Sequence, residues 1–221
     1  MAACPLIVGH RANTLRWLRR YLREGVDGVE VDAVLVGGEP RLGHPARRRR
    51  SPLLRERIAQ ILEGLHILKP MGIRDLVELV PEDIILWVDV KGRGAPELVS
   101  KILTLTRRHS IIVSTRYHDE ASELASMGKD KQIIVMLSME SRPHSLEAIA
   151  GSSGARGIAI ESSYIDEDLV REAHMLGMQV ASWTVNEESE LSRMIGLGVD
   201  YVITDYPGVA RRLCRELASR R

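Results

Sequence analysis

Short apolar segments alternate with helix-like segments along almost the whole chain of 221 residues, and this alternation restricts the fold more than any other feature. Residues 84–88 read Ile-Ile-Leu-Trp-Val, which is apolar on both faces, as a parallel strand covered by helices requires. The expected strands cover residues 6–11, 28–36, 84–91, 111–116, 132–138, 157–163, 179–186 and 201–206. Eight strand–helix units in about 220 residues predict an α/β fold, a (β/α)8 TIM barrel, with an open doubly wound sheet as the competing architecture.

No linker or low-complexity stretch divides the chain. We therefore expect one domain over residues 1–221, with a small insertion over residues 45–80 between the second and third strands. After the second strand, Gly37-Gly38 predicts a turn into a short return strand, and helices are expected over residues 53–64 and 72–80. Asn13 is the expected N-cap of the first helix, which Gly25 ends.

The charge of the chain is nearly balanced, with 31 basic and 30 acidic residues and a net charge of +1. Nothing in this balance requires nucleic acid or a membrane as a partner. No apolar run approaches the roughly 20 residues of a membrane helix, and the N-terminus does not resemble a secretory signal, so we expect a cytoplasmic protein. Cys4 and Cys214 form no metal or redox motif and are expected to be small buried apolar residues, with a disulfide between the two ends of the chain as the alternative.

Two carboxylates of the second expected strand indicate a metal site. Glu30 and Asp32 are two residues apart, so they point to the same face of a strand and would repel each other without a cation. A hard divalent metal between them would use such oxygen ligands. His10 and Arg11, at the end of the first strand, would supply a proton carrier and a phosphate clamp. Together these residues predict a metal-dependent phosphoester site.

Polar residues lie at the ends of most of the other expected strands, where a TIM barrel carries its active site. Asp89 and Lys91 repeat the spacing of two residues within an apolar strand. Further strand ends carry Ser114, Arg116, Glu161, Trp183, Asn186 and Asp205. The set is rich in carboxylates and cations and contains no cysteine, which favours phosphate and hard-metal chemistry over zinc–thiolate or thiol chemistry.

Seven short motifs, in order along nearly the whole chain, match one known family. They are His10-Arg11-Ala12, Asn13-Thr14, Glu30-Val31-Asp32, His44-Pro45, Asp89-Val90-Lys91, Trp183-Thr184-Val185-Asn186 and Ile203-Thr204-Asp205-Tyr206-Pro207. Through them the sequence resembles the glycerophosphodiester phosphodiesterases, which are TIM-barrel enzymes of the phospholipase C-like group. Each motif alone is weak evidence, whereas seven in register are strong evidence.

Three departures from the family pattern stand out. The loop after His10-Arg11 is short and lacks the usual Pro-Glu, since Ala12 directly precedes Asn13. Pro45 replaces the Asp of the His-Asp motif, and Asp89 replaces a Glu that is longer by one methylene. We expect these changes to affect rate and substrate range more than reaction type.

The resemblance implies a role for each matching residue. Glu30, Asp32 and Asp89 would hold a divalent metal, Mg²⁺ or Ca²⁺, and His10 and His44 would be the acid–base pair. Arg11 and Lys91 would bind the phosphate, and Trp183 and Glu161 would line the substrate site. Simpler interpretations are carboxylates that only form ion pairs with Arg11 and Lys91, a Trp183 in the barrel core, and an Asp205 that orients a loop rather than taking part in chemistry.

The expected reaction is metal-dependent hydrolysis of a small-molecule glycerophosphodiester to an alcohol and a glycerol phosphate. Alternatives are a lysophospholipase D-type enzyme acting on lipids, and a catalytically impaired barrel that binds phosphate or lipid headgroups. The run Arg47-Arg48-Arg49-Arg50 predicts a solvated loop, an electrostatic funnel for anionic substrates, or transient contact with anionic lipid.

Overall fold

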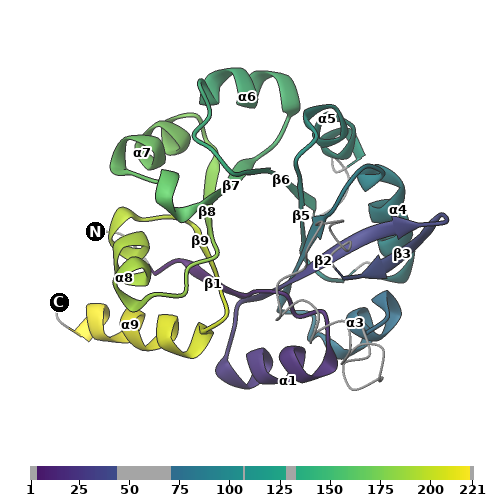
Figure 1. The fold of residues 1–221 in the computed structure, drawn as a ribbon, viewed down its shortest axis with the longest axis horizontal. Coiled ribbons are helices and arrows are strands. Elements are labelled where there is room, and N and C mark those ends of the chain that lie inside the picture. The colour runs from purple at the N-terminus through teal and green to yellow at the C-terminus, as the bar shows by residue number, and fades with distance from the viewer. Residues whose placement is uncertain (1–3, 44–70, 107, 128–132, 220–221) are drawn as a thin grey trace, which may run out of the picture.

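The computed structural model describes residues 4–43, 71–106, 108–127 and 133–219. Its strands form a closed ring with helices around the outside (Figure 1). The strands are β1 (Leu6–Gly9), β2 (Gly28–Val36), β3 (Glu39–Leu42), β4 (Ile85–Val90), β5 (Ile111–Thr115), β6 (Ile133–Met139), β7 (Gly157–Glu161), β8 (Gln179–Trp183) and β9 (Tyr201–Thr204). Eight of them run parallel, and pairing of β1 with both β2 and β9 closes the barrel. The predicted TIM barrel is confirmed, and the open doubly wound sheet is excluded.

The return strand after Gly37-Gly38 is β3, which pairs antiparallel with the outer half of β2 and lies outside the barrel. The helices are α1 (Leu15–Glu24), α3 (Ile73–Leu79), α4 (Ala95–Leu105), α5 (His118–Met127), α6 (Leu146–Ser153), α7 (Glu167–Met175), α8 (Glu188–Leu197) and α9 (Pro207–Ser219), with a short 3₁₀ helix η2 (Ser162–Tyr164). The helix expected over residues 53–64 lies outside the described residues.

Two apolar clusters explain why the strands are apolar on both faces. One cluster fills the inside of the barrel and takes residues from successive strands: Val8, Trp87, Ile112, Met136, Ala159, Ala181, Tyr201 and Ile203. The other lies between strands and helices, and it includes the neighbours of Trp87 in β4, Leu86 and Val88. Successive strand residues therefore alternate between the barrel interior and the helical layer.

The start of α1 differs from the sequence-based expectation. Thr14, not Asn13, is the N-cap, because the Thr14 side chain accepts a hydrogen bond from the backbone N–H of Trp17. Gly25 ends the helix in the left-handed conformation, as predicted. Gly9, at the end of β1, is needed for close packing, since a Cβ there would lie 2.5 Å from the ring of Tyr21.

Cys4 and Cys214 form a disulfide with their Cα atoms 5.7 Å apart. The preferred interpretation of these residues as unpaired apolar side chains was therefore wrong, and the alternative was right. The barrel brings the two cysteines together because its first strand, β1, pairs with its last strand, β9, and α9 follows β9 directly (Figure 1). Among the described residues, no helix combines the length and the apolar character needed to cross a lipid bilayer.

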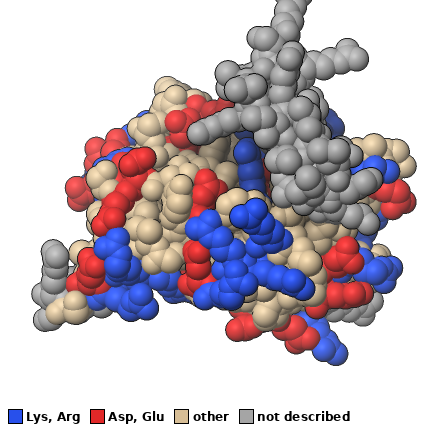
Figure 2. All heavy atoms as spheres, turned by 60° about the horizontal axis from the view of Figure 1, so that its bottom comes forward, with Lys and Arg blue, Asp and Glu red and all other residues tan. Residues whose placement is uncertain are grey.

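The face that carries α1 is rich in positive charge. Figure 2 brings the bottom of Figure 1 forward and shows Lys and Arg side chains gathered over this face, with acidic side chains more prominent around it. The helix α1, whose sequence is Leu-Arg-Trp-Leu-Arg-Arg-Tyr-Leu-Arg-Glu, carries four arginines and one acidic residue.

Candidate active site

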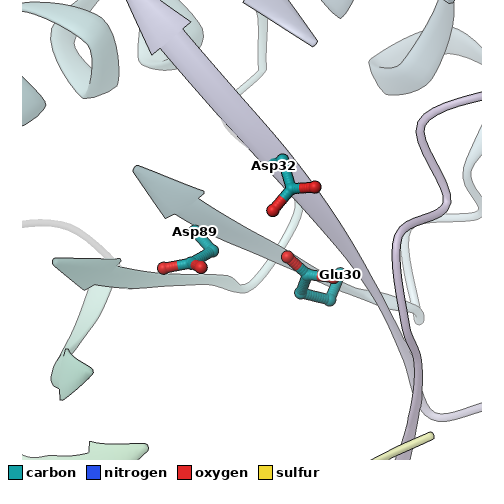
Figure 3. Close-up of side chains that lie close together, drawn as sticks. All are labelled: Glu30, Asp32 and Asp89. Carbon is teal, nitrogen blue, oxygen red and sulfur yellow. The ribbon is translucent and has the colours of Figure 1, made fainter. Parts of the chain in front are cut away.

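Three carboxylates meet at the carboxyl ends of two neighbouring strands. Glu30 and Asp32 belong to β2, and Asp89 is the register partner of Asp32 in β4. Oxygen atoms of the three side chains lie within 4.8 Å of one another (Figure 3). Glu30 and Asp32 are almost completely buried, with 3% and 1% of their surface exposed. The prediction that both face one spot, on the basis of the strand period, agrees with this geometry.

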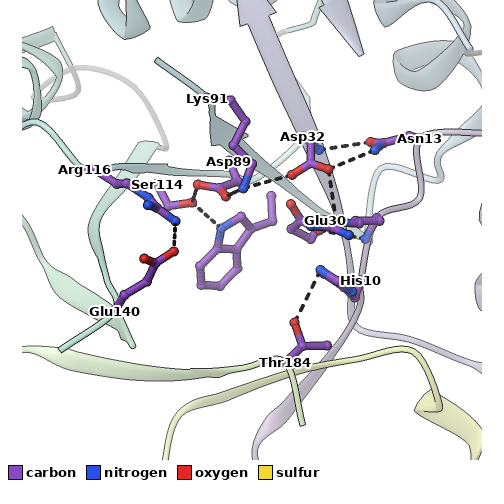
Figure 4. A network of polar contacts seen from close by, with 12 residues as sticks. His10, Asn13, Glu30, Asp32, Asp89, Lys91, Ser114, Arg116, Glu140 and Thr184 are labelled. Carbon is purple, nitrogen blue, oxygen red and sulfur yellow. Dashed lines mark hydrogen bonds and ion pairs between the residues drawn. The ribbon is translucent and has the colours of Figure 1, made fainter. Parts of the chain in front are cut away.

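Two cations lie beside this acidic cluster. The Nζ of Lys91 is 2.9 Å from Oδ1 of Asp32 and forms a second ion pair with Asp89, and Nε of Arg11 is 3.3 Å from Oδ2 of Asp32 (Figure 4). Burial alone would raise the pKa of Asp32, but the positive charges of Lys91 and Arg11 outweigh it and hold that pKa below its usual value. Burial alone would lower the pKa of Lys91, but the charges of Asp89 and Asp32 outweigh it and raise that pKa.

Glu30 has the opposite electrostatic environment. Burial, followed by the negative charge of Asp32, raises the pKa of Glu30 to about 7. Its Oε2 accepts a hydrogen bond of 2.7 Å from the backbone N–H of Arg11. Arg11 has a φ of +51°, which is uncommon for a residue other than glycine, and this backbone conformation brings its N–H to Glu30.

Neutral side chains hold the cluster in place. The amide of Asn13 donates to Oδ2 of Asp32 at 3.1 Å and accepts from the backbone N–H of Asp32 at 3.0 Å. On the other side, the indole N–H of Trp87 donates to Oγ of Ser114 at 3.0 Å, and the Ser114 hydroxyl donates to Oδ1 of Asp89 at 2.7 Å. The carboxylates of Asp32 and Asp89 therefore have fixed orientations (Figure 4).

His10 lies next to the acidic cluster, and its ring is oriented by the last strand of the barrel. Its Nδ1 is 2.9 Å from Oδ1 of Asp205, and its Nε2 is 3.4 Å from the hydroxyl of Thr184. Asn186 donates to the other oxygen of Asp205 at 2.7 Å. The hydroxyl of Tyr21 donates to the backbone carbonyl of His10 at 2.8 Å, so both the ring and the backbone of His10 are held.

Of the remaining predicted site residues, Trp183 and Glu161 are described and His44 is not. Trp183 is partly exposed and packs against the apolar cluster inside the barrel, so its position is compatible with both the substrate-wall and the core interpretation. Glu161, at the end of β7, accepts a hydrogen bond of 3.2 Å from Ser163. His44 and the four-arginine run at residues 47–50 lie outside the described residues.

Three contacts at the candidate site were not predicted from the sequence. Asp205 was expected to orient a loop, but it contacts His10; Asn13 was expected to cap a helix, but it binds Asp32; and Ser114 had no assigned partner. The signal available was that all three stand at or just after strand ends, where a barrel gathers its polar residues.

The donor atoms of the acidic cluster suit a hard divalent cation. All three residues offer carboxylate oxygens, the ligand type that Mg²⁺ and Ca²⁺ prefer. Oδ1 of Asp32 is buried and accepts no hydrogen bond from the described residues, although the charge of Lys91 lies beside it. The carboxylate oxygens of the three residues therefore fit the metal that the sequence predicts, with Lys91 beside Oδ1 of Asp32.

Comparison with known proteins identifies similar chains. Over 125 residues, the chain is 24% identical to glycerophosphodiester phosphodiesterase GDPD4 of Arabidopsis thaliana, and the match covers 57% of this chain and 38% of that protein. The chain thus spans well under half the length of this curated relative.

Two solved structures share the fold. A phosphodiesterase of Oleispira antarctica in complex with the product sn-glycerol-3-phosphate has a TM-score of 0.78, 18% identity and coverage of 96% of this chain and 97% of its own. A glycerophosphodiester phosphodiesterase of Thermotoga maritima has a TM-score of 0.72 and 21% identity, with coverage of 95% and 98%.

The family assignment comes from the sequence itself. Residues 54–209, well over half of the chain, match the family model described as the glycerophosphoryl diester phosphodiesterase family. The resemblance inferred from the seven motifs is thereby confirmed, and this chain belongs to the glycerophosphoryl diester phosphodiesterase family.

Proposed function

We propose that this protein hydrolyses glycerophosphodiesters to an alcohol and a glycerol phosphate in a metal-dependent reaction. The observation that carries the proposal is the acidic cluster of Glu30, Asp32 and Asp89 beside the His10–Asp205 pair, at the carboxyl ends of the barrel strands. Family membership and the sn-glycerol-3-phosphate complex of the Oleispira antarctica relative support the substrate class.

Glu30, Asp32 and Asp89 would hold the metal, which we expect to be Mg²⁺ or Ca²⁺. When bound, the metal supplies positive charge to the phosphate oxygens and lowers the pKa of a hydroxyl that it contacts. Arg11 and Lys91 would hold the non-bridging oxygens of the phosphate and stabilise the negative charge that increases in the transition state. Lys91 already forms ion pairs with Asp32 and Asp89, so the substrate phosphate would share its ammonium group with these two carboxylates.

His10 would move a proton at Nε2. Its Nδ1 contacts Asp205, which leaves Nε2 facing the site with only a long contact to the Thr184 hydroxyl. Histidine suits this role because its usual pKa lies near neutral pH. By family resemblance, a glycerol hydroxyl would give its proton to one histidine and attack phosphorus, and the P–O bond to the alcohol would break as the other histidine protonates the leaving alcohol. Water would then open the resulting cyclic phosphate. His44 is the predicted second acid–base residue.

Several predictions concern the whole protein rather than the site. A cytoplasmic location, the absence of a nucleic-acid partner, and one domain with an insertion over residues 45–80 all stay predictions. The lysophospholipase D alternative depends on the shape of that insertion, most of which lies outside the described residues.

The test is the identity of the products. We expect the protein, supplied with Mg²⁺ or Ca²⁺, to convert glycerophosphocholine to choline and glycerol phosphate. The reaction can be followed by ³¹P NMR. Asp89→Asn should slow turnover by roughly 100-fold or more, because a neutral amide replaces a charged ligand while its oxygen can still accept the Ser114 hydrogen bond. Asp83→Asn is the matched control, since Asp83 is exposed in the turn before β4. Release of phosphocholine, or equal rates in the two variants, would contradict the proposal.

A further inference from the structure

The exposed side of α1 carries an unusual density of arginine. Arg16, Arg19, Arg20 and Arg23 lie within ten residues, and Glu24 is the one acidic residue of the helix. The first turn contains no carboxylate. These side chains contribute to the positive region on the face shown in Figure 2.

Three of these arginines form no ion pair with the described residues, whereas several surface arginines elsewhere in this protein do. Arg20 pairs with Glu24 at 2.7 Å, but no carboxylate of the described residues lies within 4.0 Å of Arg16, Arg19 or Arg23. By contrast, ion pairs neutralise arginines on other helices and loops, namely Arg93, Arg116, Arg142, Arg171, Arg193 and Arg212. The charge of α1 is therefore available to an external anion.

Apolar side chains flank this charge. Leu18 and Tyr21 are buried against the barrel, which turns the arginines outward. Leu15 and Trp17, in the first turn of α1, are each 36% exposed. The guanidinium of Arg20 lies 5.1 Å from the centre of the Trp17 ring and holds it in place.

This end of α1 lies beside the active site. Asn13, two residues before Leu15, hydrogen-bonds Asp32 of the acidic cluster. A surface that binds the first turn of α1 would therefore lie close to the entrance of the site.

We propose that the outer face of α1, with Arg16, Arg19 and Arg23 pointing outward and Leu15 and Trp17 on its two flanks, binds the surface of an anionic lipid bilayer. Arginine forks match lipid phosphates, and exposed Trp and Leu side chains insert at the boundary between headgroups and acyl chains. A nucleic acid would use the same charges but would leave Leu15 without a function, so the combination favours lipid. Binding does not depend on turnover, and the proposal therefore stands apart from the proposed reaction.

The test is co-sedimentation of the full chain with vesicles, without substrate. We expect binding to vesicles of phosphatidylcholine and phosphatidylserine, weak binding to phosphatidylcholine alone, and weaker binding at high salt. The triple variant Arg16→Gln, Arg19→Gln, Arg23→Gln should lose roughly 100-fold in partitioning. The control variant Arg41→Gln, Arg108→Gln, Arg156→Gln removes the same formal charge from exposed arginines of β3 and of two loops, where Arg108 pairs with Glu82, and should bind nearly as wild type.

Two further variants separate the apolar contribution and the substrate site from the contribution of the arginines. Trp17→Ser should weaken vesicle binding without changing its salt dependence, and circular dichroism checks that every variant is folded. Asp89→Asn should bind vesicles as wild type, which would separate this surface from the substrate site. The proposal is overturned if wild type ignores anionic vesicles, if both triple variants lose binding equally, or if wild type binds a single-stranded RNA more tightly than the vesicles.

Discussion

At the level of single residues, the contacts of His10 determine the orientation of its ring and the stability of its charged form. Burial alone would raise the pKa of Asp205, but the hydrogen bond and charge of His10, together with the bond from Asn186, hold that pKa below its usual value. Asp205 is thus an ionised carboxylate that accepts a hydrogen bond from Nδ1 of His10. It directs Nε2 toward the site and stabilises the ring when it is charged.

Replacement of Asp205 by Asn should lower kcat by roughly 10²- to 10⁴-fold with a smaller change in KM, because Asn cannot stabilise the charged ring. The measurement is steady-state kinetics as a function of pH. Asp200→Asn is a matched control, since Asp200 contacts His174 at 2.9 Å in a second His–Asp pair outside the site. If the two variants were equally active, Asp205 would have no role in positioning His10.

If Glu30 is a metal ligand, as proposed, metal binding should depend on pH. Because burial beside Asp32 raises its pKa to about 7, the metal-free side chain is mostly protonated below that pH, and a metal must displace the proton. The apparent affinity for the metal should therefore rise up to about tenfold per pH unit below about pH 7 and level off above it. Calorimetry in two buffers of different ionisation enthalpy measures the released proton.

The Glu30→Gln variant should bind metal more weakly and without this dependence on pH. The same shift affects stability: a carboxyl group whose folded-state pKa is raised stabilises the fold at low pH and loses that contribution as pH rises from about 4.5 to about 7. The metal-free wild type should lose stability relative to Glu30→Gln across this range. A constant difference in Tm would contradict the assignment.

At the scale of elements, the register of β2, β4 and β5 builds the acidic cluster. In the strand register, Asp32 of β2 lies opposite Asp89 of β4, and Asp89 lies opposite Ser114 of β5. The Trp87 indole, which points into the barrel, completes the chain of hydrogen bonds through Ser114 to Asp89. Asp89 is shorter than the Glu of the family pattern, and this chain of bonds sets the position of its shorter side chain.

Ser114→Ala should weaken metal binding by roughly 10- to 100-fold, because Asp89 loses the donor that orients it. Ser182→Ala in β8 is the matched control: the Ser182 hydroxyl is buried without a hydrogen-bond partner among the described residues, so its removal should leave metal affinity unchanged. Metal titrations of the two variants give the comparison. Equal affinities would show that Ser114 does not position Asp89.

At the scale of the whole molecule, the Cys4–Cys214 disulfide joins residues 210 positions apart. Such a link restricts the unfolded chain and typically adds about 2–4 kcal/mol to the free energy of unfolding. It also fastens the segment before β1 to α9, next to the β1–β9 pairing that closes the barrel. Its effect belongs to the stability of the barrel, because neither cysteine contacts the acidic cluster.

Reduction, or the Cys4→Ser, Cys214→Ser variant, should lower Tm by roughly 5–15 °C and leave kcat nearly unchanged. Thermal unfolding with and without reductant measures the first effect, and mass spectrometry counts free thiols. A Tm that does not respond to reductant in protein shown to contain the disulfide would contradict this account.

Much of this structure follows from local patterns. The strand period placed Glu30 and Asp32 on one face, and the alternation of strands and helices predicted the barrel. The contact between His10 and Asp205 spans 195 positions, so it becomes visible only when β1 and β9 pair. Asn13 satisfied the rule for an N-cap, but its neighbour Thr14 took that role because Asn13 is held by Asp32. Such competition between local and long-range hydrogen bonds cannot be decided from sequence.

The requirement for a metal is tested by the rate of glycerol phosphate release from glycerophosphocholine by protein treated with EDTA and then resupplied with Mg²⁺, Ca²⁺ or Mn²⁺. We predict that EDTA abolishes turnover, that at least one of these ions restores it in wild type, and that none restores it in Glu30→Gln. Undiminished turnover in EDTA, or no turnover with any of the ions in folded protein, would contradict the account.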